Sequence, residues 1–310
     1  MKKMFYSFFA IILLSSFISA QKLSVVETLK LTDKSQGEFY FPKNSPDGLK
    51  IFFTSASYKG IWYYDVSAKK IIPFATEEGA GYEYVFSNDN KAIIYRANNL
   101  DERGLRHNQS LVRRSLEDLQ SQVIVTATEL STPKVLASNK VAYMASGNVI
   151  LKADGSRLNK TGASDLAVYN VDGKIILYMN GAKKEFSPFE GGQYIWPSLS
   201  PDGTKILFTE VHKGAFISDL DGKNMVSLGN ISAPNWSPDG KWITYMVEKD
   251  NGEFITGAEI FVSSSDGTNK YQLTDTSDLI EMYPVWASDG NSILFNSVDG
   301  SIYSMKLKME

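Results

Sequence analysis

"PNWSPDGKWITYM" (residues 234–246) places a proline and a tryptophan before a Ser-Pro-Asp-Gly turn, with an alternating apolar segment after it. Nearly the same phrase returns as "PKNSPDGLKIFFT" from residue 42, "PSLSPDGTKILFT" from 197 and "PVWASDGNSILFN" from 284. Weaker copies surround Ser87, Ser138 and Asn170. Seven copies at spacings of 30 to 51 residues are typical of a protein built from one repeated structural unit.

Each copy divides into short segments that alternate apolar and polar residues. In the copy at Ser200, "PSLS" precedes the turn, and "KILFTE", "GAFISDLDG" and "KNMVSLG" follow it. Such segments, separated by Gly, Asp, Asn and Pro, predict antiparallel strands. We therefore expect an all-β fold, a β-propeller of seven blades with four antiparallel strands each. Six blades remain the alternative, with the copies at Ser138 and Asn170 forming one irregular blade.

The two ends of the repeat region predict how the ring closes. "LTDKSQGEFYFPKNSPDG" (31–48) and "LTDTSDLIEMYPVWASDG" (273–290) have equal length and match at seven positions. The segment "LKLTD" thus occupies the place of a fourth strand, ahead of the first copy, while the last copy has only three strands. We expect the N-terminal strand to complete the last blade and to pair its open edge.

Residues 1–20 have the pattern of a signal peptide, because Lys2 and Lys3 precede the apolar run "FFAIILLSSFISA". No later segment offers the 18 apolar residues of a membrane span. Because the repeat runs through the rest of the chain, residues 21–310 are expected to form a single propeller domain. Without residues 1–20, 30 basic and 35 acidic side chains remain, which argues against nucleic acid as a partner. With no cysteine to form disulfides, the fold must be stabilised by its apolar core.

The phrase "PxxSPDGxxIxF" resembles the repeats of the TolB-like, WD-type β-propeller superfamily over residues 24–308. The resemblance implies that the repeated residues are structural, the proline and the glycine shaping the turn and the aspartate accepting hydrogen bonds from its amides. It also implies an exported, periplasmic or secreted protein that serves as a scaffold for interactions with other proteins of the bacterial cell envelope.

Functional residues are expected on the loops between second and third strands and between blades, which emerge on one face of a propeller. The long loops 98–109 and 248–258 and the inter-blade segments 76–84 and 189–196 carry the polar and aromatic side chains expected there. The predicted contact residues are Tyr82, Asp101, Arg103, Arg106, His107, Tyr194, Trp196, Glu248 and Glu253.

The sequence carries little sign of a catalytic site. The sequence contains two histidines, too few for a multi-histidine metal site, and His212 is expected to be a scaffold residue. We therefore expect a non-enzymatic monomer without cofactor or metal, which binds an envelope protein, a peptide or a glycan. The alternative is a carbohydrate-active hydrolase or lyase with carboxylates at the channel mouth, which a propeller also supports. A third hypothesis is that the protein is a sensor for a small ligand held between blades.

Overall fold

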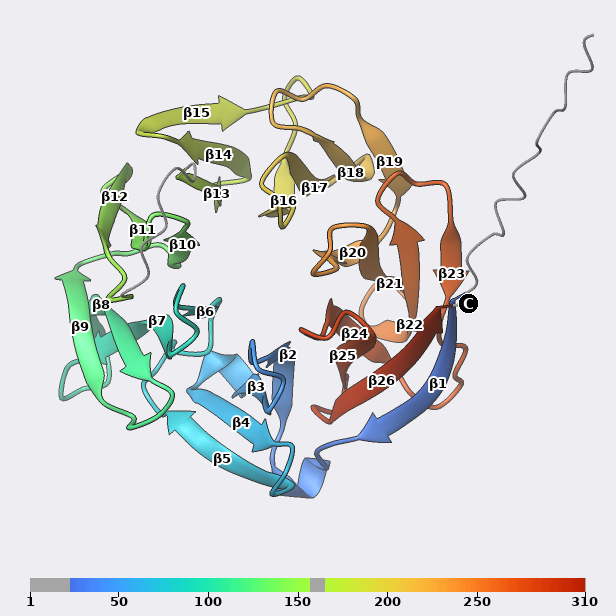
Figure 1. Ribbon diagram of the computed structural model, residues 1–310, viewed down its shortest axis with the longest axis horizontal. Coiled ribbons are helices and arrows are strands. Elements are labelled where there is room, and N and C mark those ends of the chain that lie inside the picture. The colour runs from blue at the N-terminus through green and yellow to red at the C-terminus, as the bar shows by residue number, and fades with distance from the viewer. Residues whose placement is uncertain (1–22, 157–164, 310) are drawn as a thin grey trace, which may run out of the picture.

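Seven antiparallel β-sheets surround a common axis in the computed structural model, which describes residues 23–156 and 165–309 (Figure 1). The predicted signal peptide, residues 1–20, lies outside these residues. Within the described ranges, no helix is long and apolar enough to span a membrane. Besides strands, the described residues form two short 3₁₀ helices, η1 (Lys34–Gln36) and η2 (Ala56–Tyr58).

We number the sheets as blades I to VII in the order in which the chain forms them. Within each blade, the strands are given from the innermost one outward. Blade I contains β2 (Phe39–Asn44), β3 (Lys50–Ser55), β4 (Ile61–Asp65) and β5 (Lys70–Ala75). Blade II contains β6 (Val85–Phe86), β7 (Ala92–Leu100), β8 (Arg106–Ser115) and β9 (Ser121–Ala127). Blade III contains β10 (Lys134–Leu136), β11 (Lys140–Ala145) and β12 (Asn148–Ala153), and blade IV contains β13 (Leu166–Val171), β14 (Lys174–Met179) and β15 (Ala182–Phe186).

The remaining three blades each have four strands. Blade V contains β16 (Tyr194–Leu199), β17 (Lys205–Glu210), β18 (Gly214–Asp219) and β19 (Val226–Gly229). Blade VI contains β20 (Ser232–Trp236), β21 (Trp242–Asp250), β22 (Ile255–Ser264) and β23 (Lys270–Gln272). Blade VII contains β24 (Glu281–Trp286), β25 (Ser292–Ser297), β26 (Ile302–Met309) and, outermost, β1 (Leu23–Lys30).

The predicted seven-bladed, all-β propeller is confirmed, and the six-bladed alternative is not what the chain forms. The copies at Ser138 and Asn170 build two separate sheets, blades III and IV, rather than one irregular blade. These two blades have three strands each among the described residues, and residues 157–164 between them lie outside those residues.

The ring closes as the two ends of the repeat region predict. Strand β1 pairs antiparallel with β26, from Leu23 opposite Met309 to Lys30 opposite Tyr303. Beyond the strand, the amide of Ile302 donates to the hydroxyl of Thr32 at 2.9 Å, and the amide of Leu31 donates back to the carbonyl of Ile302 at 2.8 Å. The N-terminal segment is thereby the fourth strand of the last blade.

The repeated turns have the structural role that the resemblance implies. In the turn at Ser237, the serine hydroxyl donates to the Asp239 carboxylate at 2.6 Å and accepts from the amide of Trp242 at 2.9 Å. The Asp239 carboxylate also accepts from the amide of Lys241 at 3.1 Å. The same network recurs at Ser45 and Ser200. These aspartates are therefore occupied in holding each turn closed.

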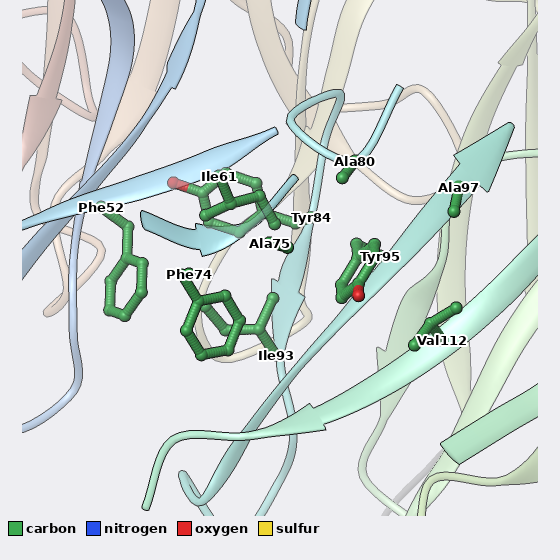
Figure 2. Packing of buried hydrophobic residues seen from close by; sticks show 10 residues of the cluster. All are labelled: Phe52, Ile61, Phe74, Ala75, Ala80, Tyr84, Ile93, Tyr95, Ala97 and Val112. Atoms are coloured by element: carbon green, nitrogen blue, oxygen red, sulfur yellow. The ribbon is translucent and has the colours of Figure 1, made fainter. Parts of the chain in front are cut away.

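Apolar side chains fill the spaces between blades. Figure 2 shows the cluster between blades I and II, in which Phe52 and Phe74 of blade I meet Ile93 and Tyr95 of blade II. Tyr84, from the segment that joins the two blades, is buried in the same cluster. Among the described residues, a cluster of this kind lies between each of the seven pairs of neighbouring blades. Each Å² of buried apolar surface contributes about 25 cal/mol, and these clusters stabilise a chain without disulfides.

The two faces of the ring carry different connections. In each four-stranded blade the strands alternate in direction, so the loop from the second to the third strand and the segment that leads to the next blade emerge on one face of the ring, which we call the loop face. The Ser-Pro-Asp-Gly turns lie on the opposite face, the turn face. The predicted contact loops therefore share the loop face.

Candidate functional site

Five innermost segments carry an unusual backbone conformation at the loop face. Residues with φ between 50° and 55° stand four positions before the first residue of the repeated turn, namely Phe41, Glu83, Trp196, Ala233 and Tyr283. In β2, β16, β20 and β24 the pairing register shifts at this residue. Glycine is the residue that adopts such φ values at least cost. Larger side chains at this position indicate that the side chains themselves have a use.

Aromatic rings from three of these segments and from η2 form a continuous row, which we call the aromatic arc: Tyr283, Phe41, Tyr58 and Tyr82. The centroids of Tyr283 and Phe41 are 4.5 Å apart, and those of Phe41 and Tyr58 are 5.4 Å apart in a stacked pair. Tyr82 meets Tyr58 edge-on at 4.9 Å. The guanidinium of Arg96 ends the row, 5.4 Å from the Tyr82 ring centre. The arc thus runs from blade VII through blade I to blade II.

Hydrogen bonds from neighbouring blades hold the arc in place. The amide of Phe41 donates to the side-chain oxygen of Asn296, a fully buried residue of blade VII, at 3.1 Å. The amide of Gly81 donates to the carbonyl of Tyr58 at 3.2 Å. A Cβ at position 81 would lie 2.7 Å from the carbonyl of Gly60, so only glycine permits this close approach.

A hollow of about 360 Å³ opens beside the arc. It lies between blades VII and I, and its walls come from the loop-face ends of their inner strands and from η2. Phe41, Tyr58 and Tyr283 of the arc contribute to its lining, together with Tyr40 and Met282. A larger hollow of about 520 Å³ lies between η1 and β5, where Lys69 and Lys70 border it. We take the smaller one as part of the site because the arc itself forms its wall.

Charged groups follow the arc into blades II and III. The Glu83 carboxylate accepts a hydrogen bond from the Thr132 hydroxyl at 2.8 Å and pairs with the Lys134 ammonium at 3.3 Å. Although burial acts in the other direction, these two partners hold the pKa of Glu83 below its usual value. The Lys43 ammonium donates to the carbonyl of Tyr84 at 2.8 Å, and burial lowers its pKa to about 8.

Two long hairpins flank the arc on the loop face. Strands β7 and β8 in blade II, and β21 and β22 in blade VI, have nine or ten residues, against six and five for β3 and β4 in blade I. Because blades VI, VII, I and II follow one another around the ring, the arc lies between these two hairpins (Figure 1). Their tips expose Leu105 and Phe254, the latter to 65%. We call these hairpins the arms.

The structure places eight of the nine sequence-predicted contact residues on the arc, on the two arms or at the loop-face end of β16. Tyr82, 37% exposed, belongs to the arc. Asp101, Arg103, Arg106 and His107 lie on the blade II arm, with Asp101 and Arg103 paired at 2.8 Å, and Glu248 and Glu253 lie on the blade VI arm. Trp196 is 41% exposed at the loop-face end of β16, across the ring from the arc.

Tyr194 requires a correction, because it is a core residue and not a surface contact. Its side chain is 1% exposed and packs against Phe208, with ring centroids 5.7 Å apart. Its hydroxyl donates to the carbonyl of Phe189 at 3.1 Å and accepts from the amide of the same residue at 3.0 Å. The alternation along β16 directs Tyr194 into the blade, while Trp196 lies at the register shift.

Phe41, Tyr58 and Tyr283 are members of the arc that sequence reasoning did not select. Phe41 and Tyr283 stand in strand segments of the repeat, whereas the sequence predicts contact residues in the loops and between blades. The signal that finds them is positional: they occupy the same place in the repeat as Trp196, four residues before the turn. Tyr58 carries no such signal, since η2 interrupts the connection between β3 and β4.

Comparisons with known proteins support the fold. No protein-family model and no curated protein sequence matches this chain. Among solved structures, TolB from Acinetobacter baumannii superposes with a TM-score of 0.52 at 19% identity, covering 81% of this chain. This chain covers 58% of the length of TolB. An oligogalacturonate lyase in complex with manganese has a TM-score of 0.52 at 15% identity, covering 93% of this chain and 96% of the lyase.

At these identities the likeness is one of fold, and it confirms the resemblance to TolB-like propellers at that level. The manganese complex raises the question of a metal site in this chain. Within residues 23–156 and 165–309, no group of three or more His, Asp or Glu side chains is placed to hold a metal ion. His107 and His212 belong to different blades, II and V. The described residues do not fit such a site, and we derive no chemistry through a metal.

Proposed function

We propose that this protein is an exported, non-enzymatic propeller that binds a peptide segment of a partner protein across the loop face. The aromatic arc carries the proposal. Four rings in one row, bordered by a hollow, form a surface on which apolar and aromatic side chains of a ligand can pack, and such surfaces dominate protein–protein binding energy. Residues 1–20 support export, and the fold shared with TolB supports an envelope location.

The arms favour a polypeptide ligand over a small molecule. Exposed apolar side chains at their tips, Leu105 and Phe254, offer contacts on both sides of the arc. The polar residues around them, including Arg103, Arg106 and Glu253, provide the charged rim that surrounds the apolar centre of many interfaces. A ligand that reaches both arms must extend across blades VII and I.

The blade II arm provides the first test. Replacing residues 99–108 by Asn-Gly joins Asn98 and its register partner Gln109 through a two-residue turn. We expect this variant to keep its thermal transition, because the removed residues lie outside the blade core, and to lose the peptides that the wild-type protein selects. The measurement is enrichment of a random-peptide phage library on immobilised protein, with residues 21–310 as the wild-type form.

Leu49→Ser is the matched control, because Leu49 is 59% exposed on the turn face. It should retain the wild-type peptides. Equal enrichment on the wild-type protein and the arm variant, or loss of enrichment on the turn-face variant, would contradict the proposal.

A carbohydrate-active lyase is the second candidate, and the likeness to oligogalacturonate lyase over nearly the whole chain favours it. It predicts that the protein cleaves oligogalacturonate by elimination, which forms a double bond that absorbs ultraviolet light. The assay is run with and without added manganese. Cleavage that depends on the protein would replace the binding proposal, whereas the binding proposal predicts no cleavage in either condition.

A further inference from the structure

Glu281 is a buried carboxyl group directly behind the wall of the hollow. It is the first residue of β24 and has no exposed surface. The next two residues, Met282 and Tyr283, line the hollow, and Tyr283 is the first ring of the arc. The position of this side chain therefore affects one side of the proposed binding surface.

The two contacts of the Thr276 hydroxyl bear on the protonation state of Glu281. The Thr276 hydroxyl lies 3.0 Å from the carbonyl oxygen of Leu279 and 3.0 Å from Oε1 of Glu281. A hydroxyl has one hydrogen, and a carbonyl oxygen can only accept. If Thr276 donates to Leu279, the contact with Glu281 is a hydrogen bond only when the carboxyl group supplies the proton. Both contacts are satisfied when Glu281 is a neutral acid.

The surroundings favour the same state. The carboxylate of Glu259, on β22, accepts from the amide of Thr276 at 3.2 Å, so two acidic side chains meet at one residue. No ion pair compensates Glu281 in the part of the chain that the structure describes. Oε2 of Glu281 is buried without a partner there. Burial raises the pKa of Glu281 to about 7, and the charge of Glu259 adds to this effect, whereas hydrogen bonds from the side chains of Thr276 and Thr274 act in the opposite direction.

We propose that Glu281 is a positioning residue that, as a neutral acid, holds the segment from Thr276 to Tyr283 against blade VI, and that its ionisation loosens this side of the hollow. A charged Glu281 would be buried, without a cation, beside Glu259, and such a state is costly. The segment relieves that cost by moving outward, which displaces Tyr283 from Phe41. The consequence for ligand binding rests on the proposed function, whereas the loosening itself does not.

The direction of the pH effect follows from linkage. Below pH 4.5, the ordinary value for Glu, both the folded and the unfolded chain hold the proton. Between 4.5 and about 7, the folded protein keeps a proton that the unfolded chain releases, so rising pH favours unfolding. Above about 7 both states are ionised, and the loss of stability is complete.

Glu281→Gln tests the proposal, since glutamine keeps the shape and donates a hydrogen bond without titrating. When the pH rises from about 5 to about 8, the thermal midpoint of the wild-type protein should fall by roughly 5 °C more than that of E281Q. Hydrogen exchange of residues 276–283, corrected for the intrinsic pH dependence, should accelerate over the same range in the wild-type protein only. Neither readout uses a ligand, so their failure is distinct from failure of the proposed function.

Glu253→Gln, an exposed acid on the blade VI arm, is the matched control and should follow the wild-type profile. Glu259→Gln removes the neighbouring charge and should move the wild-type pH transition to lower pH, a result that does not depend on the folding of E281Q. Identical pH profiles of the wild-type protein and E281Q, or an unmoved transition in E259Q, would overturn the proposal.

Discussion

Replacing Phe41 by glycine is expected to weaken binding of a selected peptide by roughly 30-fold, or about 2 kcal/mol, while the fold keeps nearly its full stability. Phe41 is the central ring of the arc, between Tyr283 and Tyr58. Its φ of 55° costs a phenylalanine roughly 1 kcal/mol or more relative to glycine. The glycine variant recovers that cost and loses the ring contacts, which are worth a similar amount.

Calorimetric titration with the enriched peptide measures the first effect, and differential scanning calorimetry measures the second. Ala233→Gly is the matched control, because Ala233 has a φ of 50° at the same place in blade VI and the substitution removes no aromatic ring. Its binding constant should equal that of the wild-type protein. Equal losses of affinity in both variants would mean that the backbone at this position, rather than the aromatic ring, supports binding.

Deleting residues 23–30 is expected to lower the free energy of unfolding by roughly 5 kcal/mol and the thermal midpoint by about 10 °C or more. The deletion removes seven register pairs between β1 and β26 and the buried side chain of Leu23. It also leaves β26 as an unpaired edge, so that the shortened protein should associate at high concentration.

Two comparisons separate closure of the ring from a general effect of shortening. Val26→Ser changes a side chain that is 58% exposed and leaves the strand pairing intact, so its thermal midpoint should stay near the wild-type value. A synthetic peptide of residues 23–32 added to the shortened protein should restore part of the lost stability. A deletion variant as stable as the wild-type protein would show that β1 is dispensable for the closed ring.

Much of the fold is predictable because the repeat acts through local chemistry. Each Ser-Pro-Asp-Gly turn specifies its own hydrogen bonds, and the apolar alternation after it specifies a strand, so seven copies predict seven blades. The match between 31–48 and 273–290 predicts the closing strand for the same reason. The strand count of blades III and IV is not predictable in this way, since their copies lack the complete turn phrase.

The site is less predictable, because it depends on where neighbouring blades meet. Tyr194 and Trp196 are two residues apart, yet one is buried and the other exposed, and the register shift at Trp196 decides this. The row formed by Phe41, Tyr58 and Tyr82 joins residues of three separate segments. The lengths of the loops 98–109 and 248–258 predict the two long hairpins of blades II and VI, whereas composition alone did not reveal the arc between them.

Hydrogen–deuterium exchange of the protein with and without a selected peptide tests most directly whether the aromatic arc is the binding site. Binding at the arc should slow exchange in residues 39–41, 56–58, 81–83 and 281–283, and leave the turn-face segments 45–49 and 237–241 unchanged. Protection confined to the turn face, or to the outer strands of the blades, would contradict the assignment of the arc as the binding site.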